Sequence, residues 1–205
     1  MPELDTTHLI AIAAALGWAS GLRLYAVVFL TGLAGYLGWV PLPPGLHLLE
    51  QPPMLWASGA LLVIEFLADK IPFVDSIWDT VHTVIRIPAG AVLAAAVFGG
   101  DQSTWAGVAA LLGGTLAATA HAAKASTRAA VNTSPEPFSN VALSLAGDAA
   151  VPTMLWLSWE HPVLFFIALG LACIVMIGAI VLLFGFLRRM LGGLRRRFDP
   201  DSAEA

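Results

Sequence analysis

The sequence has few charged residues and almost no cysteine. Of its 205 residues, 12% are charged and 58% are hydrophobic, whereas a soluble globular domain has about 25% charged and about 45–50% apolar residues. So little charge cannot cover a globular surface, which excludes a soluble single domain, and so many apolar residues exclude a disordered chain. Cys173 is the single cysteine, so a disulfide-stapled secreted domain is excluded as well.

The sequence also lacks the features that several other classes of protein require. The formal net charge of −4 gives no basic surface for nucleic acid. The sequence has no HExxH, CxxC or calcium-loop motif for a metal and no GxSxG motif of a serine hydrolase. Residues 1–8 include Glu3 and Asp5 but no Lys or Arg, so they lack the positive region of a signal peptide. With a mean hydropathy of +0.81, what remains is a polytopic membrane protein surrounded by lipid bilayer.

Long apolar segments predict an all-α fold of about six membrane elements, two of them broken by proline. A helix needs about 20 residues to cross the hydrocarbon core, and proline prevents a helix from continuing normally. Pro72 and Pro88 interrupt the first half of the chain, and residues 132–140 form the second break. The predicted elements are residues 9–40, 54–70, 74–99, 104–131, 141–159 and 162–187, with a proline-rich loop at 41–53.

The first element is too long for one straight crossing. A single helix over residues 9–40 would be about 48 Å long at 1.5 Å per residue, whereas the hydrocarbon core is about 30 Å thick. Ser20 and Gly21, followed by Arg23, favour a break or kink near Gly21. Whether this element crosses once or dips into the membrane and returns stays open, and so does the side on which the N-terminus lies.

The predicted domain organisation is one transmembrane domain over residues 1–190 and a basic, then acidic, tail over residues 191–205. Its halves, 1–100 and 101–190, each contain a long apolar element and a proline-containing interruption, a pattern weakly similar to the repeats of transporters. Five of the ten Lys and Arg residues lie between positions 188 and 197. Because basic residues beside a membrane helix stay on the cytoplasmic side, we expect a cytoplasmic C-terminus.

Two stripes of polar residues lie within the apolar sequence, and each has the three- or four-residue spacing of one helix face. The first is Asp75, Asp79, His82 and Arg86, with Glu65 and Asp69 upstream, and the second is His121, Lys124, Arg128 and Asn132. A charge at the bilayer centre costs at least about 2.5–3.5 kcal/mol. Because the first stripe is mainly acidic and the second mainly basic, we predict that the stripes face one another and pair away from lipid.

These stripes and their polar neighbours are the candidate residues for binding a substrate or ion. The set is Glu65, Asp69, Lys70, Asp75, Asp79, His82, Arg86, His121, Lys124, Arg128, Asn132, Ser134, Glu136 and Asn140. Three interpretations stay open: the stripes could touch water at the membrane surface, pair only to hold helices together, or line a functional site. The sequence assigns no catalytic residue.

A bound divalent metal is a further hypothesis. Carboxylate oxygen and imidazole nitrogen suit Mn, Fe, Zn or Co. Asp75, Asp79 and His82 could supply ligands from one helix face, with Glu65 or His121 from elsewhere. No metal motif accompanies these residues, and no other cofactor is expected.

Two long strings of residues resemble a known family. EFLADKIPFVDSIWDTVHTVIRIPAGA (65–91) and HAAKASTRAAVNTSPEPFSN (121–140), with GLRLY (21–25) upstream, are similar to the bacterial domain-of-unknown-function 4126 membrane family over roughly residues 10–188. The resemblance implies a polytopic protein of the bacterial inner membrane and brings no established activity. The residues that match the family's motifs are Glu65, Asp69, Lys70, Pro72, Asp75, Trp78, Asp79, Arg86, His121, Lys124, Asn132, Ser134, Pro135, Glu136, Pro137 and Asn140.

The leading functional hypothesis is a small membrane transporter or ion pathway coupled to protons or cations. The carboxylates of the first half would bind a cation or relay protons, because burial disfavours a carboxylate's charged form and so allows proton exchange near neutral pH. One alternative is a lipid-phosphate flippase or a membrane enzyme acting on a phosphorylated headgroup. In either case His121, Lys124 and Arg128 would donate hydrogen bonds to the phosphate. Another is a structural or assembly role. A small ion or an anionic lipid is the expected ligand, and a homo-oligomer stays open.

Overall fold

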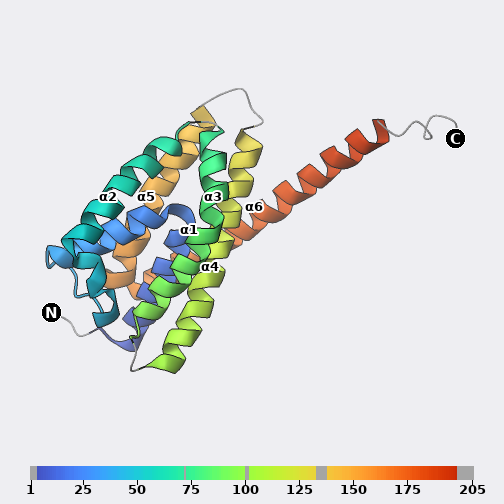
Figure 1. Ribbon diagram of the computed structural model, residues 1–205. Helices are drawn as coiled ribbons and strands as arrows, with labels where there is room; N and C mark the ends of the chain where they lie inside the picture. The colour runs from blue at the N-terminus through green and yellow to red at the C-terminus, as the bar shows by residue number, and fades with distance from the viewer. Residues whose placement is uncertain (1–3, 72, 100–101, 133–137, 198–205) are drawn as a thin grey trace.

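The computed structural model describes residues 4–71, 73–99, 102–132 and 138–197, and within these residues every regular element is a helix. The predicted all-α fold is therefore confirmed. In chain order the helices are α1 (Thr6–Tyr36), the 3-10 helix η1 (Pro44–Glu50), α2 (Pro52–Ala68), α3 (Val74–Ala96), α4 (Ser103–Val131), α5 (Phe138–Glu160) and α6 (Pro162–Arg197) (Figure 1).

Four of the described helices are long and apolar enough to cross a membrane: α1, α4, α5 and the Pro162–Gly185 part of α6. Helices η1 and α2, which meet at a bend of 69°, raise this number to five if the pair is one span. Residues 44–50 were predicted as part of a loop, but they form η1. Pro44 stands at the start of η1, where its fixed φ and its missing N–H suit a first helical turn.

Several predicted breaks are now located. Pro88 lies inside a continuous α3, so residues 74–87 and the apolar residues after them form one helix, as predicted. Gly99 begins the predicted turn after α3 with a φ of 65°. Pro72 and residues 100–101, 133–137 and 198–205 lie outside the described residues. The second break was predicted over residues 132–140, but residues 138–140 form the start of α5. Of the predicted tail, 191–205, residues 191–197 continue α6.

Helix α1 begins with a side-chain cap and bends at its centre. The His8 backbone N–H donates to Asp5 Oδ1 at 2.9 Å, which satisfies one free donor of the first turn. That hydrogen bond lowers the pKa of Asp5, because it stabilises the ionised carboxylate. Further along, Arg23 has non-helical dihedral angles, φ −147° and ψ 83°. The predicted kink near Gly21 is therefore confirmed.

The first part of α1 runs parallel to α4 through the centre of the bundle. Gly17 lies against Gly113, and Gly21 lies against the Ala117 carbonyl. Residues further along α1 therefore contact residues further along α4, which is the pattern of two parallel helices. Residues 11–22 of α1 are almost all buried, because glycine and alanine at these contacts let the helix backbones approach closely.

The second part of α1 returns along α2. The Phe29 ring lies against Gly59 in the middle of α2, whereas Gly32 lies against Leu49, just before α2 begins. Gly45 in turn lies against the carbonyl of Ala96, where α3 ends. Both ends of α1 therefore lie towards the same end of the bundle, where α3 passes into α4, and α1 turns back at Arg23.

Helix α3 turns its charged face into the protein and its apolar face outward. Asp75, Asp79 and Arg86 are at most 2% exposed, whereas Val84 is 76% and Val92 67% exposed. A surface helix in water has the opposite arrangement. The interpretation in which this stripe touches water at a membrane surface is therefore wrong. Figure 1 shows α3 beside α4 over most of its length.

Helix α6 crosses the bundle and then extends beyond it (Figure 1). Its apolar side chains are largely uncovered, for example Ile174 at 70% and Leu182 at 75% exposure. An apolar surface of this extent on several helices suits contact with the hydrocarbon of a bilayer.

Candidate functional site

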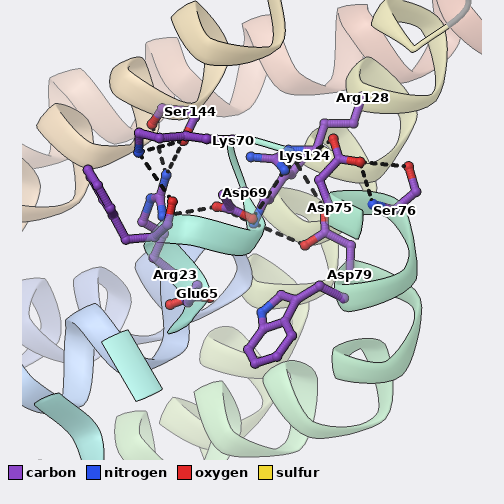
Figure 2. A network of polar contacts seen from close by, with 12 residues as sticks. Arg23, Glu65, Asp69, Lys70, Asp75, Ser76, Asp79, Lys124, Arg128 and Ser144 are labelled. Carbon is purple, nitrogen blue, oxygen red and sulfur yellow. Dashed lines mark hydrogen bonds and ion pairs between the residues drawn. The ribbon is translucent and has the colours of Figure 1, made fainter. Parts of the chain in front are cut away.

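Five carboxylates and five cations form one connected set of ion pairs, which we call the ion network, and Figure 2 shows the part of it around Asp69. Its charges balance, and helices α1 to α5 or the residues directly after them all contribute. The members are Arg23, Glu65, Asp69, Lys70, Asp75, Asp79, Arg86, Lys124, Arg128 and Asp148. The prediction that acidic groups of the first half meet basic groups of the second half, away from lipid, is confirmed.

Asp69 is the centre of the ion network. It directly follows α2 and is fully buried. Its carboxylate lies 2.9 Å from Arg23, 3.1 Å from Lys124 and 3.1 Å from Arg128. A negative charge is unfavourable at the C-terminal end of a helix, so these three cations offset both that effect and the loss of water.

Arg86 and Asp79 form the most enclosed part of the network. Arg86 Nη1 donates to Asp79 Oδ1 and Arg86 Nη2 donates to Glu65 Oε1, each at 2.6 Å. Asp79 also lies 3.0 Å from Lys124 Nζ. Because Lys124 contacts both Asp69 and Asp79, it joins the two most buried clusters of carboxylates.

Arg23 and Asp148 belong to the network although neither was in the candidate set. Arg23 Nη2 lies 3.0 Å from Asp148 Oδ1 and donates to Ser144 Oγ at 2.9 Å. Lys70 Nζ contacts Asp148 on its other side at 3.1 Å. A sequence signal existed, because each is the single charged residue within a long apolar segment and so needs a partner.

The ion network also supplies a hydrogen bond to the backbone at the bend of α1. Lys124 Nζ donates to the carbonyl of Leu22 at 3.0 Å, next to the non-helical Arg23. Backbone that departs from helix at membrane depth has to be buried in protein or line a cavity, because lipid offers it no hydrogen bond. Lys124 therefore holds the bend of α1 as well as two carboxylates.

The outer end of the network joins the start of α3 to the end of α4. Arg128 Nη1 lies 3.3 Å from Asp75 Oδ2. Asn132 Nδ2 donates to Asp75 Oδ1 at 3.1 Å and to Ser76 Oγ at 2.9 Å. These contacts bring Asn132 to the network, as the spacing predicted.

The two histidines lie beside the ion network rather than within it. His82 stacks on Trp78 with ring centroids 4.1 Å apart, and its Nε2 is 3.0 Å from the Tyr25 hydroxyl. His121 Nε2 is 2.7 Å from Thr83 Oγ1. Among the described residues no group of three or more His, Cys, Asp or Glu side chains is placed to hold a metal. The metal hypothesis therefore gains no support here.

The remaining candidate residues fall at the start of α5 and before it. Asn140 is 1% exposed but makes none of the ion-pair contacts above. Ser134 and Glu136 lie outside the described residues.

A cavity of about 810 Å³ lies beside the ion network, among α1, α4, α5 and α6. Four network residues form its polar end: Arg23, Asp69, Lys124 and Arg128. This end holds three cations and one carboxylate, so it is locally positive although the whole network is balanced. The other walls are almost entirely apolar and include Leu157 of α5. Sequence reasoning did not find this cavity, because its walls are mostly ordinary alanine, leucine and methionine.

Fold and site together define a multi-pass helical membrane protein with a buried, charge-balanced polar centre. The chain belongs to the family described as a domain of unknown function, DUF4126, whose model matches residues 10–182. The resemblance seen in the sequence is therefore confirmed. No curated protein and no solved structure matches the chain.

Proposed function

We propose that this chain is a small membrane transport protein in which the ion network binds and releases the transported or coupling ion. The observation that carries the proposal is the bent path of α1, which places Arg23 in the network and beside the cavity. Broken helices that meet charged side chains inside the membrane form the binding sites of many transporters.

A purely structural role accounts less well for ten paired charges. Desolvation costs several kcal/mol per ion, and replacing a buried ion pair by packed apolar side chains is often neutral or stabilising by about 1–4 kcal/mol. Charged side chains within membrane segments are costly and accompany ion or substrate pathways. Apolar helix contacts could hold this bundle together with less cost, so the charges favour a function beyond assembly.

Asp69 offers a way to couple a proton to an anion. It lies within 3.1 Å of each of three cations that face the cavity. An anion entering the cavity adds a negative charge beside these three cations, and uptake of a proton by the ion network would restore the balance. Proton and anion would then bind together, which is the requirement for transporting them in the same direction.

The packing also supports a membrane topology. Helix α3 presents apolar side chains outward, so we assign it as a crossing helix, and α1 as one that enters and returns. Helices α2 to α6 then make five crossings. The basic residues from 188 to 197 favour a cytoplasmic end of α6, in the bacterial inner membrane that the family resemblance implies. The start of α1 would lie on the opposite side.

Transport is testable by proton flux in proteoliposomes loaded with a pH-sensitive dye, with the membrane potential clamped by potassium and valinomycin. After an external acid step, wild-type vesicles should acidify severalfold faster than protein-free vesicles, and Asp69→Asn should remove this excess. Glu160→Gln, which changes an exposed carboxylate outside the network, is the matched control and should behave as wild type. Equal rates for wild-type and protein-free vesicles, or for wild type and Asp69→Asn, would overturn the proposal.

A further inference from the structure

We propose that the cavity beside the ion network binds a single-chain anionic amphiphile taken from the bilayer. Its carboxylate or phosphate head would lie against Arg23, Lys124 and Arg128, and its acyl chain along the apolar walls. This inference rests on the proposed function in that it names the class of substrate.

The size and walls of the cavity fit an acyl chain. Its volume of about 810 Å³ lies within the range of about 300–1,000 Å³ that is typical of small-molecule sites. Apart from its charged end, the walls come from apolar residues such as Leu143, Met154 and Met176. Such walls give water few hydrogen-bond partners, so an apolar occupant is favoured over a water-filled space.

The charged end fits an anionic head. Nη1 of Arg23 and Nη1 of Arg128 lie within ion-pair distance of Asp69, at 2.9 and 3.1 Å. Neither atom makes an aligned hydrogen bond to any of the described residues, although both side chains are at most 3% exposed. Each of these two buried guanidinium groups thus has an Nη1 that is paired by charge but not by an aligned hydrogen bond, and guanidinium binds carboxylate and phosphate with paired N–H donors.

The route into the cavity points to lipid rather than water. Leu171 and Val175 of α6 line the cavity, yet they are 61% and 70% exposed. The cavity is therefore reached past apolar side chains of a membrane-spanning helix. An amphiphile already dissolved in the bilayer can enter by this route, whereas a free inorganic anion would have to leave water first.

Binding is measured on the purified full chain in a nonionic detergent, by titration with radiolabelled oleate and with radiolabelled oleoyl lysophosphatidate. We expect saturable binding of at least one of them at one molecule per chain. Monoolein, which has the same chain and a neutral head, and inorganic phosphate, which has no chain, should not bind at the same concentrations. The two labelled probes also distinguish a carboxylate head from a phosphate head.

Two variants test the two ends of the site. Arg128→Gln should weaken binding by about tenfold or more, because it removes a charged hydrogen-bond donor. Ala150→Phe should block the apolar part without touching the ion network, since Ala150 lines the cavity. Ala142→Phe places the same ring on an exposed part of α5 away from the cavity lining and should bind as wild type. Thermal unfolding curves show whether each variant is folded.

The outcomes separate this inference from the proposed function. Proton flux with no saturable binding of either amphiphile would overturn the inference and leave the transport proposal standing. Saturable binding with no proton flux would overturn the transport proposal and leave the amphiphile site standing. Equal binding of monoolein, or an unchanged affinity in a folded Ala150→Phe, would also overturn the inference. So would cross-linking that places a helix of a second copy inside the cavity.

Discussion

At the scale of the residue, the ion network contains sites of very different exposure. Arg86 is fully buried between Glu65 and Asp79. Lys70 and Asp148, by contrast, each keep 22% of their side-chain surface exposed. Water screens the second pair and not the first, so the same kind of substitution should have unequal effects at the two places.

We expect Arg86→Met to lower the free energy of unfolding by about 3–5 kcal/mol, because it leaves Glu65 buried without its cation and takes one of several cations from Asp79. Lys70→Met, the matched change at the partly exposed pair, should cost less than about 1 kcal/mol. Denaturant unfolding in detergent micelles measures both. Adding Glu65→Gln to Arg86→Met should recover part of the loss, since it removes the buried charge that has lost its partner. A double variant no more stable than Arg86→Met would contradict this account.

Spacing along the sequence identified most of the network residues, but it could not identify all of their partners. Asp79 and Arg86 are seven residues apart on one helix, so their pairing follows from helical periodicity. Arg23 has no charged neighbour at helical spacing, and its partners Asp69 and Asp148 lie far along the chain. Only the packing of α1 against α2 and α5 brings these groups together.

At the scale of the element, the contacts between α1, α3 and α4 depend on glycine. A Cβ added at Gly17 would lie 2.4 Å from the Gly113 Cα, and one added at Gly113 would lie 2.4 Å from the Ala94 Cβ. Three helices therefore meet where there is no room for another methyl group. Any separation of α1 from α4 would also pull the Leu22 carbonyl away from Lys124.

We expect Gly113→Ala to destabilise the protein by about 1–3 kcal/mol, because the helices have to move apart to admit the methyl group. The control is Gly178→Ala in α6, where nothing lies within 4 Å of the added atom; it should stabilise by about 0.5–1 kcal/mol, the usual difference between alanine and glycine in a helix. Thermal and denaturant unfolding measure both variants. Equal effects at the two positions would show that the helices are not closely packed in solution.

The outward face of α3 gives a second test at the scale of one helix, namely whether its exposed apolar side chains meet lipid. Val84→Asp should reduce the folded, membrane-inserted fraction, because a charged side chain at a lipid-facing helix centre costs about 2.5–3.5 kcal/mol. Thr104→Asp, an exposed site in the first turn of α4, should be nearly neutral, since a carboxylate is favourable at the start of a helix. The measurement is the amount of protein extracted from membranes in folded form. Equal yields would place this face of α3 in water.

The extent of most elements could be predicted from apolar runs ended by proline, glycine or charge. The prediction for residues 104–131 agrees with α4 to within a residue at its start. The path of α1 could not be predicted, because a kink shows that a helix changes direction but not where the next part goes. Only the contacts of Phe29 and Gly32 with α2 and the segment before it show that α1 returns.

At the scale of the whole molecule, the number of crossings in the proposed topology depends on α1 and α3. Helix α1 is apolar enough to span a membrane but returns to the end from which it starts. Helix α3 is not among the spans recognised by length and composition, yet its charges point inward and its apolar side chains point outward. Composition counts the residues of a helix, whereas crossing depends on which side chains meet lipid.

These two assignments can be tested by labelling single cysteines in intact cells with a membrane-impermeant maleimide, after Cys173→Ala. We expect Thr6→Cys and Gln51→Cys to react together, because α1 returns to the side from which it starts. Gln102→Cys should react with them, whereas Phe73→Cys should react only after the cells are opened, because α2 and α3 each cross. If Phe73→Cys and Gln102→Cys react from the same side, α3 does not cross. If Thr6→Cys and Gln51→Cys react from opposite sides, α1 does cross, and Arg23 is then the midpoint of a kinked span rather than the deepest point of a returning helix.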